Sequence, residues 1–416
     1  MRIGYACLAL GVPGSALKGC TQKNADEARL ASLISNNLNA LERMVDYNLA
    51  NGIRLYRISS DLIPFGSSPV NRLDWTGLFR KDFQRIGEKI RAGGMRVTMH
   101  PGQYTVLSAP DEGVAVRSVK DLEYHTRVLD ALGTRQDSKI ILHLGGVYAD
   151  KAAALGRFAA RFEALDPAIR RRVVLENDER CYDIRDALEA GFRLGTPVVF
   201  DNLHHAVNPA RTQNPAYWIE ASSATWKPQD GPQKIHYSQQ DPAKKPGAHS
   251  ATIDAVTFLD YVRKLGREDL DVMLEVKDKN LSAIKCALCA SSGTDAAALE
   301  REWARYKYAV MEHGQAAYRE IAALFHAGGV SPLLFYGFVE RALQSHMEPG
   351  EAENAARHVW GYFKNAASGA ERAAFEAALA RYRDGRGTLD AVKRKLMALS
   401  EKYGERYLME SYYFCF

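Results

Sequence analysis

Residues 139–145 read Lys-Ile-Ile-Leu-His-Leu-Gly, and residues 172–178 read Arg-Val-Val-Leu-Glu-Asn-Asp. Both stretches are short and rich in β-branched residues, and each apolar run ends in a side chain that can bind a metal, His143 or Glu176. Runs without a polar face are typical of strands buried on both sides, which occur in parallel sheets covered by helices. The two stretches therefore favour an α/β fold with polar side chains at the ends of buried strands.

The same pattern repeats along the chain as far as residue 279. Segments with helical apolar spacing, such as Leu38, Leu41, Val45 and Leu49, separate the strand candidates. Eight candidates are present, at residues 2–7, 54–60, 96–101, 139–145, 172–178, 197–204, 233–239 and 270–277. Eight consecutive βα units predict a TIM (β/α)8 barrel. A doubly wound open sheet is the competing α/β architecture.

Beyond about residue 290 the strand-like runs stop and only helical patterns follow. The predicted helices cover residues 296–311, 317–325, 333–345, 352–365, 370–382 and 389–402. We therefore expect two domains, a barrel over residues 1–290 and a small all-α domain over residues 291–416, joined near Ala290-Ser291-Ser292-Gly293.

Composition narrows the class of protein. The net charge of +5 lies entirely in residues 1–290, because acidic and basic residues are equal in number from residue 291 onward. This weakly favours an anionic partner for the barrel. The six scattered cysteines do not form a disulfide framework. With no apolar stretch long enough for a membrane helix and no signal-peptide pattern at the start of the sequence, we expect a cytoplasmic protein.

Potential metal ligands lie at the carboxyl ends of the predicted strands. Active sites of TIM barrels are built at that rim, where the strand ends converge. A carboxylate after an apolar run needs a cationic partner, and imidazole with carboxylate suits zinc, manganese or iron. The set exceeds what one ion needs, so a cluster is expected. Its members are His100, His143, Glu176, Asp201, His204, His236 and Glu275.

Other side chains have a weaker pattern. Strand alternation puts Lys234 on the same face as His236, where a bare ammonium would be repelled by metal ions. A hydrogen-bonded core histidine is the alternative for any single member of the cluster. The histidines without rim placement, His125, His205 and the four beyond residue 300, are expected to be structural. Cys286 and Cys289 form half a metal site at most.

The turn Pro101-Gly102-Gln103-Tyr104 places an amide and an aromatic ring beside His100. Such a pair could enter a gap between unpaired bases, as wedging side chains do in proteins that distort nucleic acids. A packed loop aromatic is the alternative interpretation. Lys244 and Lys245 could contact phosphate, although adjacent loop lysines are usually only solvated.

At this point the chain resembles the ultraviolet damage endonucleases, from Ile3 to about Cys286. The resemblance rests on eight ordered motifs: residues 56–60 (Tyr-Arg-Ile-Ser-Ser), 99–104 (Met-His-Pro-Gly-Gln-Tyr), 143–146 (His-Leu-Gly-Gly), 175–178 (Leu-Glu-Asn-Asp), 200–204 (Phe-Asp-Asn-Leu-His), 234–238 (Lys-Ile-His-Tyr-Ser), 247–250 (Gly-Ala-His-Ser) and 273–279 (Met-Leu-Glu-Val-Lys-Asp-Lys).

The resemblance implies a metal-dependent DNA endonuclease with up to three divalent ions, usually Mn²⁺, with Zn²⁺ or Mg²⁺ as alternatives. Such an enzyme cuts double-stranded DNA immediately 5′ of ultraviolet photoproducts (cyclobutane pyrimidine dimers and 6-4 photoproducts) and of abasic sites, through hydroxide activated by the metals. It acts in the cytoplasm, on the nucleoid, and a monomer is expected.

The resemblance also assigns residues. It implies the ligands His100, His143, Glu176, Asp201, His204, His236, His249 and Glu275, and so adds His249 to the rim set. Glu176, Glu275 and Lys234 would serve catalysis, with Lys234 carboxylated, and Tyr5, Gln103 and Tyr104 would contact the lesion. Two positions depart from the family pattern: Ser68 replaces a histidine of many members, and Ala9 an asparagine of some.

Two rival functions stay open on the sequence. One is a sugar isomerase or epimerase on a similar metal barrel, and the other is a non-catalytic DNA-binding or scaffold protein. The C-terminal segment resembles a prokaryotic helical domain of unknown function, through residues 303–308 (Trp-Ala-Arg-Tyr-Lys-Tyr), 361–364 (Gly-Tyr-Phe-Lys), 382–383 (Tyr-Arg) and 407–408 (Tyr-Leu). That resemblance implies no activity, and binding of an unidentified partner by this domain stays open.

Overall fold

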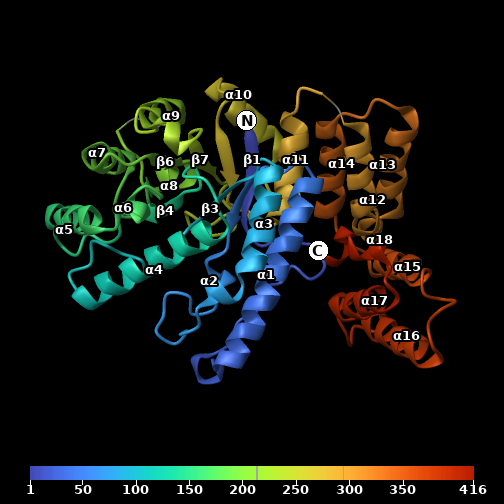
Figure 1. Ribbon diagram of the computed structural model, residues 1–416. Coiled ribbons are helices and arrows are strands. Elements are labelled where there is room, and N and C mark those ends of the chain that lie inside the picture. Colours follow the sequence, from blue (N-terminus) through green and yellow to red (C-terminus); the bar gives the residue numbers. More distant parts are fainter. Residues whose placement is uncertain (212–213, 294) are drawn as a thin grey trace. The chain divides into compact units, whose positions relative to one another are not determined.

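Eight parallel strands close into a barrel, and a separate set of helices follows it along the chain (Figure 1). The computed structural model describes residues 1–211, 214–293 and 295–416. These divide into two compact units. The first contains Met1–Ala9 and Gly14–Ala287, and the second contains Leu10–Pro13 and Leu288–Phe416. The inclusion of Leu10–Pro13 in the second unit had no signal in the sequence pattern.

The barrel confirms the predicted TIM architecture, with the strands hydrogen-bonded in sequence order and β8 returning to β1. The strands are β1 (Arg2–Cys7), β2 (Leu55–Ile58), β3 (Arg96–Met99), β4 (Ile140–His143), β5 (Val173–Glu176), β6 (Val198–Asp201), β7 (Lys234–Tyr237) and β8 (Asp271–Leu274). Most are shorter than predicted, because the chain leaves the sheet at the rim to form the loops.

The sixth strand is shorter than its predicted span of residues 197–204. It ends at Asp201, whose carboxylate accepts a hydrogen bond from the backbone N–H of His204 at 2.7 Å. Aspartate is a favourable N-cap, so a short helix, α8 (Asn202–Val207), begins directly after the strand. His204 therefore lies in the first turn of a helix, and its place in a strand was wrong.

Strand alternation fills the barrel interior in layers. Two small clusters line it, Ala6 with Leu55 and Met273, and Ile141 with Val174 and Val199. At the amino-terminal end of the strands, Arg96 inserts a guanidinium that pairs with Asp271 at 2.8 Å and lies 5.5 Å from the ring centroid of Trp226. This end is thus closed by side chains and buried ion pairs, which leaves the opposite rim for ligands.

Helices cover the outside of the barrel (Figure 1). Aspartate caps many of them at the N-terminus, for example Asp26 and Asp254, while Gly195 and Gly266 end two of them in the left-handed conformation. The helices are α1 (Glu27–Ala50), α2 (Trp75–Leu78), α3 (Arg80–Ala92), α4 (Glu112–Ala131), α5 (Lys151–Ala164), α6 (Pro167–Arg170), α7 (Ile184–Leu194), α8, α9 (Pro215–Ser223), α10 (Ala255–Leu265) and α11 (Asn280–Ala290).

The second unit is helical, as predicted. It contains α12 (Ala296–His313), α13 (Gln315–Ala327), α14 (Pro332–Gln344), α15 (Pro349–Trp360), α16 (Gly369–Arg383), α17 (Leu389–Tyr403) and α18 (Arg406–Met409). Its core gathers apolar side chains from α12 and from α15 to α18, among them Val359, Phe375 and Leu396. Among the described residues, no helix combines the length and the apolar character needed to cross a bilayer.

Candidate metal centre at the barrel rim

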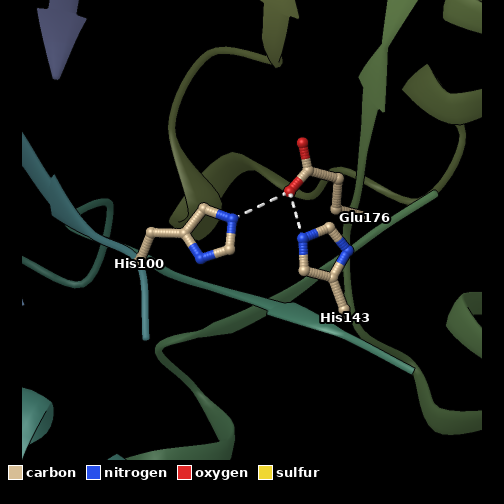
Figure 2. Close-up of side chains that lie close together, drawn as sticks. All are labelled: His100, His143 and Glu176. Atoms are coloured by element: carbon tan, nitrogen blue, oxygen red, sulfur yellow. Dashed lines mark hydrogen bonds and ion pairs between the residues drawn. The ribbon is translucent and has the colours of Figure 1, made fainter. Parts of the chain in front are cut away.

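Three side chains from neighbouring strand ends meet at one carboxylate oxygen (Figure 2). His100 follows β3, and its Nε2 lies 3.0 Å from Oε2 of Glu176, the last residue of β5. His143 ends β4, and its Nε2 lies 3.5 Å from the same oxygen. Parallel strands bring their carboxyl ends to one rim, so these residues meet although they are distant in the sequence.

Glu176 also belongs to two further groups. Its Oε1 lies 2.5 Å from Nδ1 of His236, which itself lies 3.3 Å from Oε1 of Glu275. On the other side, Nδ1 of His204 lies 4.0 Å from Oε1 of Glu176 and 3.8 Å from Oδ1 of Asp201. In each of the three groups, the potential ligand atoms lie within 4.8 Å of one another. Glu176 is therefore in a position to bridge ions.

The remaining predicted ligand lies at the edge of this cluster. His249 approaches Glu275, with 3.7 Å between its Nε2 and Oε2 of the carboxylate. A β-bridge between Gln240 and His249 anchors the loop that carries the histidine. The structure thus brings seven of the predicted ligands into the three groups and places the eighth, His249, next to Glu275.

The electrostatics at His236, His143 and Glu176 suit neutral imidazoles and an ionised carboxylate. Burial lowers the pKa of His236 to about 4 and also lowers the pKa of His143. Burial alone would raise the pKa of Glu176, but the nearby His236 and His143 and two hydrogen bonds outweigh it, so that this pKa falls below its ordinary value. Metal ligands need these protonation states, an unprotonated imidazole nitrogen and a charged carboxylate.

Asp201 and His204 differ, because both of their pKa values are raised. Burial raises the pKa of Asp201. Burial would lower the pKa of His204, but the carboxylates of Asp201 and Glu176 outweigh it and raise that pKa to about 10. A buried carboxylate that is costly to ionise gains most from a cation beside it.

Unpartnered atoms test whether metal ions fit this centre. Within the described residues, Oδ2 of Asp201, Nδ1 of His143, Nε2 of His236 and Nζ of Lys234 are buried without a hydrogen-bond partner. Buried polar atoms normally have partners, so each of these atoms calls for an additional binding partner. A carboxylate oxygen such as Oδ2 of Asp201 is a ligand that divalent metals take, and imidazole with carboxylate is a suitable ligand set, so the residues present fit a metal cluster.

Two buried basic side chains lie close to the cluster. Arg57 of β2 points inward and donates from Nη1 to Oε1 of Glu275 at 2.5 Å. Lys234 is fully buried, and burial together with the charges of Arg96 and Arg57 lowers its pKa well below the ordinary value. We predicted Lys234 near the cluster but missed Arg57. The sequence signal that indicated Lys234, a charged residue within an apolar strand, is also present for Arg57, which lies in the buried strand Leu55–Ile58.

The residues predicted to contact the lesion lie in two different environments in the structure. Gln103 and Tyr104 are exposed in the loop after β3, with 68% of Tyr104 accessible. Gln103 and His143 line a cavity of about 320 Å³, together with Tyr148 and Arg180. The pair thus lies next to the metal centre and is accessible to a large substrate.

Tyr5 is a different case. It is completely buried, its hydroxyl donates to Oδ1 of Asn48 in α1 at 2.8 Å, and its ring packs on Tyr56. Alternation in β1 turns Ala6 into the barrel and Tyr5 outward against the helix layer. This placement contradicts the expected contact between Tyr5 and a lesion.

The two departures from the family pattern are local. Ser68 closes a turn, in which its Oγ accepts from the backbone N–H of Val70 at 3.3 Å. It takes part in none of the three ligand groups. Ala9 is half-buried in the segment after β1.

The comparisons with known proteins agree with this geometry. Residues 1–297 match the family UV-endonuclease UvdE, and residues 307–416 match a family of unknown function, DUF1722. A UV DNA damage endonuclease of Clostridium perfringens (strain 13 / Type A) is 36% identical over 349 residues, which cover 83% of this chain and 84% of that protein. One of Bacillus velezensis is 32% identical, over 62% of this chain and 81% of its own length.

A solved structure supports the same conclusion. The crystal structure of SacUVDE is 35% identical, with a TM-score of 0.66, and the match covers 69% of this chain and 96% of that one. The family match spans the whole barrel and all the rim ligands. The chain therefore belongs to the UV-endonuclease UvdE family.

Proposed function

We propose that the barrel nicks damaged double-stranded DNA immediately 5′ of ultraviolet photoproducts and abasic sites, with divalent ions, Mn²⁺ by preference, at the rim. The observation that carries this proposal is the position of Glu176, whose two oxygens take part in three adjoining groups of potential ligands. Several ions that share one carboxylate are suited to phosphodiester hydrolysis. Membership of the UvdE family supports DNA as the substrate.

The ligands His100, His143, Glu176, Asp201, His204, His236, His249 and Glu275 would hold up to three such ions. When bound, the ions would activate water as the nucleophile and neutralise the scissile phosphate. Glu176 and Glu275 keep the negative charge that such ions need. Neutral His236 and His143 offer nitrogen donors without adding positive charge.

Lys234 fits the proposal best as a carboxylated side chain. Its buried Nζ has no hydrogen-bond partner among the described residues, and its low pKa favours the free amine, the form that reacts with carbon dioxide. Addition of the amine nitrogen to carbon dioxide forms a carbamate and releases one proton. The product is an anion between the guanidinium groups that lower the lysine pKa, those of Arg96 and Arg57, and it would remove the repulsion of metal ions.

Recognition of damage would depend on the exposed Gln103 and Tyr104. Pushing an amide and a ring into a base stack costs least where the stack is already distorted. The expected result is tolerance for several kinds of lesion, with a monomer as the working unit.

A duplex that carries one defined pyrimidine dimer tests the proposal. With the full chain and Mn²⁺, the 5′-labelled damaged strand should be shortened to the position immediately 5′ of the dimer, and chelator should abolish cutting. His143→Gln should slow nicking by at least about a hundredfold, since removing even a residue that orients a metal ligand costs roughly 10- to 100-fold.

The matched control is His346→Gln, a change at an exposed histidine of the second unit, whose side chain is 84% accessible. It should nick at the normal rate. Equal cutting of undamaged duplex, or full activity of His143→Gln, would refute the proposal.

A further inference from the structure

Three sequence motifs of the second unit, none of them used by the barrel, meet at one place. Lys307 and Tyr308 lie in α12, Tyr362 follows α15, and Tyr407 lies in α18. The hydroxyls of Tyr308 and Tyr362 are 2.9 Å apart, and the rings of Tyr362 and Tyr407 stack with 5.9 Å between centroids. We call Lys307, Tyr308, Tyr362 and Tyr407 the lysine–tyrosine cluster.

Lys307 is the unusual member of this cluster. Its Nζ lies 4.9 Å from the ring centroids of both Tyr308 and Tyr407. In the part of the chain that the structure describes, it makes no hydrogen bond and no ion pair. An ammonium group has three N–H donors, and attraction to ring faces satisfies none of them by a conventional acceptor. Lys307 is half-buried, and this burial lowers its pKa.

Other lysines over tyrosine rings show what a structural contact looks like in this protein. Lys402 lies 5.1 Å from the ring centroid of Tyr403 and pairs with Glu371 at 2.6 Å. Lys393 lies over Tyr413 and pairs with Glu312, and Lys151 lies over Tyr182 and pairs with Asp186. Each of these lysines has a carboxylate partner, which Lys307 lacks among the described residues. An anion that pairs with Lys307 would therefore come from outside the described residues.

The cluster also offers one exposed aromatic ring, that of Tyr362. The side chain of Tyr362 is exposed, with 42% of the residue accessible, and the nearly parallel Tyr407 ring supports it from one side. Ring faces beside a cation are how proteins bind unpaired nucleotides: the base stacks on the aromatic ring and the cation takes the phosphate.

We propose that the lysine–tyrosine cluster binds a nucleotide, free or within an unpaired nucleic-acid strand, with the phosphate on Lys307 and the base on Tyr362. This inference does not depend on the proposed function of the barrel, because every residue of the cluster lies in the second unit.

Binding to the full chain in chelator, which keeps the barrel from cutting, tests the inference. The probes are a short fluorescent single-stranded oligonucleotide and adenosine monophosphate, with inorganic phosphate as the probe that lacks a ring. Lys307→Gln should weaken binding of the oligonucleotide about tenfold. It should also lower the slope of log Kd against log salt by about 0.7, the value for one lost phosphate contact on a single strand.

Tyr362→Ala should weaken the same binding by roughly tenfold while leaving that salt slope unchanged, since base stacking carries no charge. Binding of both the oligonucleotide and adenosine monophosphate would show that a free nucleotide is sufficient for binding. Binding of the oligonucleotide alone would show that the ligand is a nucleic-acid strand. Either outcome supports the proposal.

The matched control is Lys402→Gln, which removes a lysine over a tyrosine ring that already has a carboxylate partner. Thermal unfolding of each variant checks that the second unit stays folded. An unchanged Kd in Lys307→Gln, an equal loss in Lys402→Gln, or equal competition by inorganic phosphate would overturn the proposal. Nicking of damaged duplex in Mn²⁺ should be unaffected in every variant, so a failure here is distinct from a failure of the barrel function.

Discussion

At the scale of single residues, the candidate metal centre includes a guanidinium that is not itself a proposed ligand. Arg57 donates a hydrogen bond to Oε1 of Glu275, and the other carboxylate oxygen, Oε2, faces His249. Burial would lower the pKa of Arg57, but the adjacent carboxylate outweighs it and raises that pKa further. Arg57 is therefore permanently charged, and it fixes the orientation of a carboxylate that the proposed metal ions need.

This role predicts a graded effect of substitution. Arg57→Lys keeps the charge but loses the planar fork, so Mn²⁺ affinity should fall about tenfold, and Arg57→Gln should weaken it further, since it also removes the charge-assisted hydrogen bond that orients Glu275. Electron paramagnetic resonance of free Mn²⁺ measures the affinity directly. Arg54→Lys, a change in an arginine that donates to the backbone carbonyl of Leu49, is the control. If Arg57→Gln binds Mn²⁺ as tightly as the wild type, the orienting role is wrong.

Residue-level prediction from the sequence depended on knowing which way a side chain faces. The rim positions of the proposed ligands were predictable because a strand end places its last side chains at the mouth of the barrel. Tyr5 was assigned wrongly because adjacent strand positions face opposite sides, and only the structure shows Gly4 and Ala6 to be the positions that face inward. The role of Arg57 was missed because it depends on a long-range contact, with Glu275.

At the scale of elements, the outer helices are joined by ion pairs between neighbours. The carboxylate of Glu42 in α1 forms ion pairs with Arg85 at 3.0 Å and with Lys89 at 2.9 Å, and both of these residues lie in α3. The hydrogen bond from Arg85 is the main cause that lowers the pKa of Glu42, from 4.5 to about 2. The apolar period of each helix was readable in the sequence, but this pairing was not, because it depends on how α1 and α3 pack.

The pair predicts a pH-dependent contribution to stability. A lowered folded-state pKa means that the stabilisation is complete above the unfolded value of 4.5 and is lost as the pH falls toward 2. Glu42→Gln should therefore destabilise the barrel by about 1 kcal/mol at pH 7, a modest value because both cations are partly exposed. In calorimetry this is a decrease of roughly 2 °C in the barrel Tm, vanishing near pH 2. Glu88→Gln, on an exposed position of α3, should show no such change. A difference that persists unchanged at low pH would contradict this account.

At the scale of the whole molecule, the chain divides into two compact units. Among the described residues, the core cluster around Val359, Phe375 and Leu396 is built from residues of the second unit. The proposed metal ligands all belong to the first unit. The change from strand–helix alternation to helices alone made this organisation readable in the sequence, whereas the membership of Leu10–Pro13 in the second unit depends on tertiary contacts.

The division into two units predicts that Mn²⁺ changes the unfolding temperature of one unit and not of the other. A ligand that binds only the folded form stabilises it by RT ln(1 + [L]/Kd), about 2.7 kcal/mol at a hundredfold excess over Kd. Mn²⁺ should therefore raise the unfolding temperature of the barrel by several degrees and leave the transition of the second unit where it is. Phe375→Ala, which creates a cavity in the core of the second unit, should lower only the unfolding temperature of that unit. This change therefore identifies which transition in the scan belongs to the second unit. Calorimetry of the full chain with and without chelator makes the measurement. If both transitions move together with Mn²⁺, the two units unfold as one, and if neither moves, the rim does not hold the metal that its histidines and carboxylates imply.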